Sequence, residues 1–133
     1  MVICGSPSGW SLIASAGSAS AVGSALRPAT YEAVAKESEA NEPGIPWMNV
    51  YEVQGADALI IQEVFQDGDA LGWHLGGTAA NHFPKLSEIA DIGPFFFFGD
   101  VPDDLVQAAS GMNMGEVFAT RAFGFSRSPS EIA

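Results

Sequence analysis

Polar and apolar residues alternate along segment 45–53, and a second segment with the composition of a strand, 57–65, follows after a short turn. In the first segment Trp47, Asn49 and Tyr51 fall on one side, and the residues between them fall on the other. The second segment, DALIIQEVF, is rich in β-branched residues, and the Gln-Gly pair between the two segments suits a short turn. The pattern therefore predicts a β-hairpin.

Other elements follow from compact apolar runs and from residues that begin or end helices. Asp67 is suited to cap a helix at its N-terminus, and Pro28 should divide or start the helix in which it lies. Pro84 falls within the first turns of its helix, where proline is tolerated. Four phenylalanines at 95–98 would place rings on both faces of a strand, so we expect both faces to be covered. The further predicted strands are 10–16, 92–101 and 116–125, and the predicted helices lie within 18–41, 68–75, 79–90 and 101–110.

The order of these elements predicts the fold class. A hairpin combined with helical crossovers favours an α+β fold of the ferredoxin-like kind, an antiparallel sheet with helices on one face. We expect one domain over residues 10–127, preceded by a flexible lead-in at 1–9 and followed by a frayed tail at 128–133.

Charge and composition exclude some classes of partner. The formal net charge is −11 with only five basic residues, so a phosphate-binding patch cannot be assembled. We therefore expect no nucleic acid and no anionic membrane as partner. Hydrophobic residues make up 47% of the chain and charged residues only 16%, below the roughly 25% of soluble domains. Some apolar surface should therefore meet another subunit or line a pocket.

The cysteine content and the N-terminus suggest a compartment. Cys4 is the single cysteine, which excludes an internal disulfide and favours a reduced, cytoplasmic setting. The first 21 residues end in small residues, as a signal peptide does, but no lysine or arginine precedes Arg27. No segment approaches the roughly 20 apolar residues that span a bilayer. We expect a soluble, cytoplasmic protein.

The two histidines are the first candidates for chemistry. His74 lies late in its predicted helix, where it could relay a proton or instead hold the helix to a strand. His82 follows Asn81 at the start of the next helix and could face solvent or a pocket. Their spacing fits none of the usual zinc patterns, and the nucleophile-elbow and nucleotide-binding glycine patterns are absent. We therefore expect no metal and no cofactor.

Two further features could bind a ligand or complete the core. The alternating Trp47, Asn49 and Tyr51 could form the wall of a pocket for a flat aromatic ligand, although an aromatic stripe can also be core. Arg121, on the last predicted strand, could pair with Glu52 or Glu63, or could anchor an anionic substrate.

Four motifs together resemble the antibiotic biosynthesis monooxygenase family of dimeric α+β barrels. In that family a helix ends at an EPG-like turn, and a strand carries Y-E. Its hairpin partner ends in E-x-W before an acidic helix start, and that helix carries A-L-x-x-H ahead of an H-F pair. The resemblance covers about residues 10–100; Phe65 stands where the family often has tryptophan, and 99–127 add a strand. The matching motifs are EPG at 42–44, YEV at 51–53, EVFQDGDALGWHL at 63–75 and NHF at 81–83.

The resemblance implies a homodimeric oxidoreductase. Such an enzyme needs no cofactor: it deprotonates a phenol or quinol in an apolar pocket, and the electron-rich anion reacts directly with O₂. By this resemblance His74 would relay the proton and Asn49 and Tyr51 would hydrogen-bond the substrate. The other expected substrate contacts are Trp47 and Phe65, as stacking walls, and Trp73, His82 and Arg121.

Two other functions remain open from the sequence. A non-catalytic barrel that binds a hydrophobic small molecule would keep the aromatic lining without needing a titrating group. Haem-degrading relatives use a histidine as iron ligand, which His74 or His82 could supply. The asparagine that those enzymes carry on the first strand has no clear match in WSLIASA.

Overall fold

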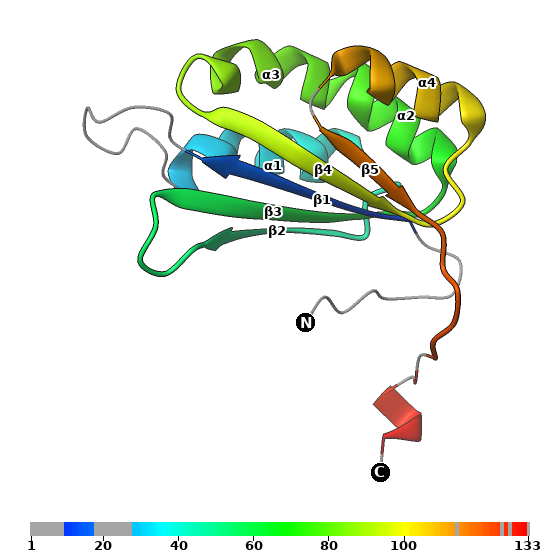
Figure 1. The fold of residues 1–133 in the computed structure, drawn as a ribbon. Coiled ribbons are helices and arrows are strands. Elements are labelled where there is room, and N and C mark those ends of the chain that lie inside the picture. The colour runs from blue at the N-terminus through cyan, green and yellow to red at the C-terminus, as the bar shows by residue number, and fades with distance from the viewer. Residues whose placement is uncertain (1–9, 18–27, 114, 126, 128, 133) are drawn as a thin grey trace.

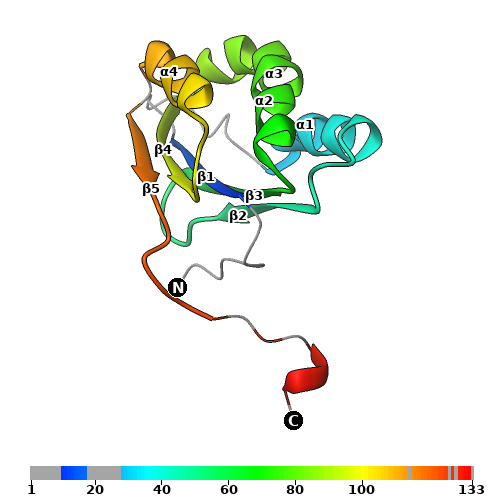
Figure 2. The same cartoon turned by 90° about the vertical axis from the view of Figure 1, so that its right-hand side faces the viewer.

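The computed structural model describes residues 10–17, 28–113, 115–125, 127 and 129–132. Five strands form one sheet in the order β2-β3-β1-β4-β5, and the four helices all cover the same face (Figures 1 and 2). This confirms the predicted α+β, ferredoxin-like class. The strands are β1 Trp10–Gly17, β2 Trp47–Glu52, β3 Ala58–Phe65, β4 Asp91–Phe98 and β5 Glu116–Ala119. The helices are α1 Pro28–Asn41, α2 Gly68–Gly76, α3 Thr78–Ser87 and α4 Asp103–Met112, followed by a 3₁₀ turn η1 at Pro129–Glu131.

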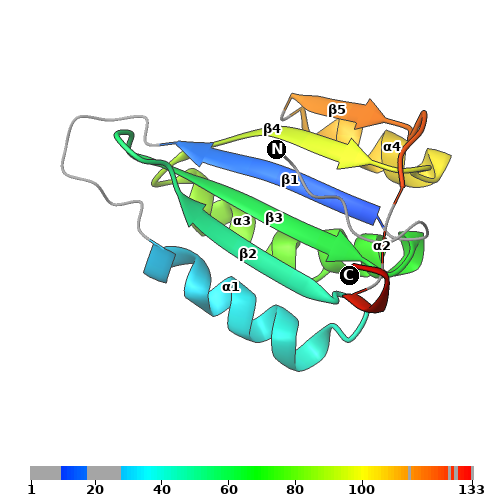
Figure 3. The same cartoon turned by 90° about the horizontal axis from the view of Figure 1, so that it is seen from below.

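The predicted hairpin is confirmed as β2 and β3. Trp47 lies opposite Val64 and Tyr51 opposite Ile60, so the alternation read from the sequence is the alternation of the sheet. The connection is longer than a two-residue turn, because pairing ends at Glu52. One side of the hairpin meets the four α-helices. None of these helices covers the other side, which we call the bare face of the sheet (Figure 3).

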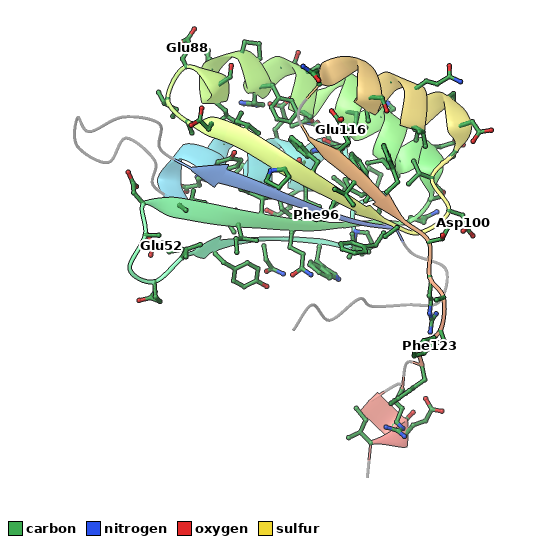
Figure 4. All side chains as sticks on the ribbon, viewed as in Figure 1. Glu52, Glu88, Phe96, Asp100, Glu116 and Phe123 are labelled. Carbon is green, nitrogen blue, oxygen red and sulfur yellow. The ribbon has the colours of Figure 1, made fainter. Side chains whose placement is uncertain are left out.

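The last strand departs from the predicted antiparallel arrangement. β5 runs parallel to β4, with Phe95 opposite Glu116 and Phe98 opposite Ala119. A parallel neighbour requires a crossover connection, and α4 supplies it by carrying the chain back along the sheet. The strand also ends at Ala119, earlier than predicted, and the chain then leaves the sheet on the side away from the helices. Figure 4 shows Phe123 on this exposed segment.

The core lies between the sheet and the helices in two clusters. Phe95 and Phe97 point to the helices and are buried, whereas Phe96 points to the bare face and is partly exposed. The rings therefore lie on both faces, as predicted, but described residues cover only one. One cluster joins Tyr31, Val34, Leu59, Ile61, Leu86 and Ala90, and the other joins Phe65, Leu71, Phe95, Phe97 and Ala109.

Helix ends follow the predicted signals with one exception. The Asp67 side chain accepts a hydrogen bond from the Ala70 N–H at 2.8 Å, which confirms the N-cap of α2. Pro28 begins α1, while 18–27 and the expected lead-in at 1–9 lie outside the described residues. Pro84 lies inside α3 and not in its first turn, since the helix begins at Thr78. Within the described part of the chain, none of the helices is long and apolar enough to cross a membrane.

Candidate functional site

A cavity opens between the helix-covered face of the sheet and helices α1, α2 and α3. It contains about 460 Å³ of space when the solvent at its open mouth is counted, and the centres of water-sized molecules can occupy about 40 Å³ of it. Most of its wall is apolar, and the polar side chains come from few positions. The lining residues are Tyr31, Val34, Met48, Ile61, Glu63, His74, Leu75, Ala79, His82, Phe83, Leu86, Ile92 and Phe95.

His74 lies between two buried glutamates at the wall of this cavity. Its Nδ1 is 3.0 Å from Oε2 and 3.2 Å from Oε1 of Glu42, and its Nε2 is 3.4 Å from Oε1 of Glu63. The side chains of the three residues are only 3–5% exposed. Both ring nitrogens of His74 therefore face carboxyl groups in a site almost without water. We call Glu42, His74 and Glu63 the buried acid–base cluster.

Three separate elements position the cluster. His74 lies on the inner side of α2, one turn after buried Leu71. Glu63 occupies a helix-facing position of β3, where its neighbours on the same face, Ile61 and Phe65, are apolar and buried. Glu42 follows α1 directly and accepts a hydrogen bond from the Ser38 hydroxyl at 3.3 Å. The cluster thus exists only when the helices are packed on the sheet.

Burial controls the protonation of the carboxyl that faces the cavity. Loss of hydration raises the pKa of Glu63 above its usual range; the positive charge of His74 partly offsets this rise, and the charge of Glu42 adds to it. Burial, with the Glu63 charge as a smaller cause, also raises the pKa of Tyr31 to about 12. Glu63 therefore holds a proton more readily than an exposed glutamate and can exchange it with His74 Nε2.

A second histidine and glutamate pair lies at the rim of the cavity. His82 Nε2 is 2.7 Å from Oε2 of Glu37, which ties α3 to α1. The hydrogen bond from the His82 side chain is the main reason why the pKa of Glu37 lies below its usual range. Unlike the buried cluster, this pair is partly open to solvent. His82 therefore contributes a polar group where the cavity meets water.

The structure brings together only part of the predicted site. His74 and His82 both line the cavity. Phe65 is fully buried, and its ring centroid is 5.3 Å from that of His74. It packs against the imidazole and is not one of the residues that line the cavity.

Trp47, Asn49 and Tyr51, the predicted pocket wall, lie on the face of the sheet away from the helices and do not line this cavity. These residues alternate as expected, but they point away from the helices, and Tyr51 is 48% exposed. Met48, between them, is the β2 residue that lines the cavity. The physical reason is that the helices cover the face with the aliphatic side chains, leaving Trp47 and the polar Asn49 on the bare face.

Two other expected substrate contacts also lie outside the cavity. Trp73 is 59% exposed on the outer side of α2. Arg121 lies beyond the end of β5 and is exposed, and in the described part of the chain it pairs with neither Glu52 nor Glu63. Glu63 meets His74 instead, because its position on β3 directs it to the helices.

The sequence reasoning missed Glu42 and Glu63 as members of the site. A signal for Glu63 was present, because it falls on the same side of the alternating strand as Leu59, Ile61 and Phe65. A glutamate among inward-facing apolar residues must find a partner or keep a proton. Glu42 stands in the EPG motif at 42–44, but no local pattern linked it to His74, since their contact spans 32 residues of sequence.

Comparisons with known proteins identify the fold. No protein-family profile matches the chain, and no curated protein is significantly similar in sequence. MupZ from Pseudomonas fluorescens has a similar structure at 20% identity and a TM-score of 0.65, over 94% of this chain and 98% of that one. SnoaB from Streptomyces nogalater, a cofactor-independent oxygenase, matches at 17% identity and a TM-score of 0.53, over 71% and 95% of the two chains.

A third structure carries the name of the family that the motifs resemble. It is a putative antibiotic biosynthesis monooxygenase from Chloroflexus aurantiacus J-10-fl, similar at 19% identity and a TM-score of 0.52, over 71% of this chain and 93% of that one. At such identities the likeness concerns the fold. The chain has the ferredoxin-like α+β fold of the antibiotic biosynthesis monooxygenases, as its motifs predicted.

Proposed function

We propose that the cavity is the active site of a cofactor-independent monooxygenase that oxidises a phenolic or quinol ring with O₂. The observation that carries the proposal is the buried acid–base cluster at the wall of a mostly apolar cavity. Buried groups with a shifted pKa in a cleft are typical of sites that move protons. The fold shared with a cofactor-independent oxygenase supports the same reaction class.

The reaction begins with proton removal. The substrate hydroxyl donates its proton to the Glu63–His74 pair, and the ring becomes an electron-rich anion that O₂ can attack at a ring carbon bearing hydrogen. One oxygen atom stays on that carbon as a carbonyl. The other leaves as water with the hydrogen from the carbon and the proton from the hydroxyl, so a phenol and O₂ give a quinone and water.

The cluster suits this step because it keeps the charge of the cavity constant. When the pair takes up the proton, the cluster loses one negative charge as the substrate gains one. In surroundings of low polarity this compensation matters, since an uncompensated buried charge is costly. Glu42 stays bonded to His74 Nδ1 and fixes the ring so that Nε2 faces Glu63. Glu63 and His74 therefore act as base, and Glu42 positions them.

We further propose that the bare face of the sheet packs against the same face of a second copy. That face exposes Tyr51, Ile60, Phe96 and Val117, which lie on four strands of the sheet and are 36–48% exposed. Figure 3 shows the strands from this side. Contiguous apolar surface of this kind commonly marks a subunit interface, and one face used by both copies gives a two-fold dimer. Trp47 and Asn49 would then lie in the interface and not in the active site.

Oxygen uptake tests the proposed reaction. A panel of phenols and quinols would be incubated with the wild-type protein, with Glu63→Gln and with Glu88→Gln. Glu88 is an exposed glutamate at the end of α3, so Glu88→Gln is a matched control. We expect uptake with some member of the panel, unchanged in Glu88→Gln and reduced roughly 100-fold or more in Glu63→Gln, the usual contribution of a general base.

Other outcomes would replace the proposal. If aromatic ligands raise the melting temperature of the folded protein but no oxygen is consumed, the chain is a binding protein. If haemin binds and gives a Soret band that His74→Ala or His82→Ala abolishes, the site is a haem site.

A further inference from the structure

In the described part of the chain, the cavity wall has no lysine or arginine side chain that would neutralise an anionic ligand. Among the described basic residues, Lys36 forms an exposed pair with Glu32 on α1, and Lys85, Arg121 and Arg127 are exposed elsewhere. The imidazoles that do line the cavity are engaged, His74 with two glutamates and His82 with Glu37.

The charges that do lie near the cavity are acidic. Glu63 is part of the wall, Glu42 lies directly behind His74, and Glu37 holds the rim through His82. The chain as a whole carries a formal charge of −11, which adds to the negative potential. A ligand with a carboxylate or phosphate would lose hydration on entry. The described wall would offer it only imidazoles that already contact carboxyl groups, and the repulsion from those carboxyl groups would be poorly screened.

The polar groups of the wall also lie at two separate places. The Glu63–His74 pair is buried, whereas His82 is partly open at the rim. Side chains such as Val34, Ile61 and Leu86 line the cavity with them. The wall thus suits an apolar ring that offers one hydroxyl group to the buried pair and a second polar, uncharged group to His82.

We propose that the cavity selects uncharged aromatic alcohols and excludes the corresponding carboxylates and phosphates. The identity of the reacting hydroxyl rests on the proposed function. The charge selection does not, because it concerns binding alone and follows from the residues of the wall.

A pair of ligands that differ only in charge provides the test. We would measure the binding of 1,4-dihydroxy-2-naphthamide and of 1,4-dihydroxy-2-naphthoate by calorimetry at pH 7.5 without oxygen. The two have the same rings and nearly the same size, but only the second is an anion. We expect the amide to bind at least tenfold more tightly. Equal or tighter binding of the carboxylate would overturn the charge selection, and no binding of either would overturn the ligand class.

A variant should reverse the preference. Leu75 lines the cavity from a half-buried position on α2, where a long side chain can be accommodated. Leu75→Lys should reduce the preference for the amide at least fivefold, whereas the uncharged control Leu75→Gln should retain it. An unchanged preference in a folded Leu75→Lys protein would also count against the inference. Oxygen uptake in air is measured in a separate experiment. If the protein prefers the uncharged ligand but consumes no oxygen, the proposed reaction is refuted and the charge selection stands.

Discussion

His74→Leu should destabilise the protein strongly, because it leaves two buried carboxyl groups without their shared partner. In the wild type the side chains of Glu42 and Glu63 are 3–4% exposed and both contact the imidazole. Removing one partner of a buried ion pair costs about 3–5 kcal/mol. Domains of this size have a total stability of about 5–15 kcal/mol, so the melting temperature should fall by roughly 10–15 °C.

The loss should depend on pH in a defined direction. The positive charge of His74 lowers the pKa of Glu63, so this pKa should rise further when His74 is replaced. A carboxyl whose pKa is raised in the folded state destabilises the fold as pH increases above its ordinary value near 4.5. The destabilisation by His74→Leu should therefore be larger at pH 8 than at pH 5.

Urea unfolding of five proteins at pH 5 and pH 8 tests this prediction. We would compare the wild type, His74→Leu, Glu63→Gln and the double variant, with His82→Leu as control. Adding Glu63→Gln to the His74→Leu variant should raise its free energy of unfolding by about 1 kcal/mol or more, because it removes one unpaired buried carboxyl group. His82→Leu should cost much less, since Glu37 reaches water. A cost for His74→Leu below about 1 kcal/mol, or one independent of pH, would refute the argument.

Three further outcomes are expected. Asp67→Ala should lower the free energy of unfolding by about 1 kcal/mol in urea titrations, because the Ala70 N–H loses its acceptor; Asp67→Asn should largely retain the stability. In an ultraviolet titration Tyr31 should ionise only near pH 12, and Tyr31→Phe should remove that step. Above about pH 10 the tyrosine of the unfolded chain ionises while buried Tyr31 does not, so the wild type loses stability up to about pH 12. Tyr31→Phe should not show this loss. Phe96→Asp on the bare sheet face should shift the sedimentation of the protein from dimer to monomer; a wild type that sediments as a monomer would contradict the proposed interface.

Local patterns were sufficient to predict much of the fold, but not which face of the sheet is inside. The alternation from Trp47 to Tyr51 was correct in register, yet aromatic and aliphatic residues compete for the core, and only the packing of the helices decides between them. Asp67 could be assigned because a capping interaction spans three residues. The direction of β5 could not, because it depends on how far α4 carries the chain back.

Only part of the candidate site could be predicted from the sequence, for a similar reason. His74 was prominent as one of two histidines and through the family resemblance. Its partners lie on other elements, and Glu42 is 32 residues away, so their contact is a property of the tertiary structure. Arg121 illustrates the opposite error, because a lone positive charge on a predicted strand suggested a pairing that the short β5 does not allow.

The proline inside α3 affects the motion of the cavity wall. Pro84 has no N–H to donate to the carbonyl of Ala80, and its ring pushes against that turn of the helix. His82 and Phe83, which line the cavity, immediately precede it. The backbone that carries them is therefore held by fewer hydrogen bonds than a regular helix, and bending there requires no loss of the sheet or of the buried cluster. We expect amide hydrogens in this turn to exchange with solvent faster than those of β3, so that a ligand can enter while the buried acid–base cluster stays fixed.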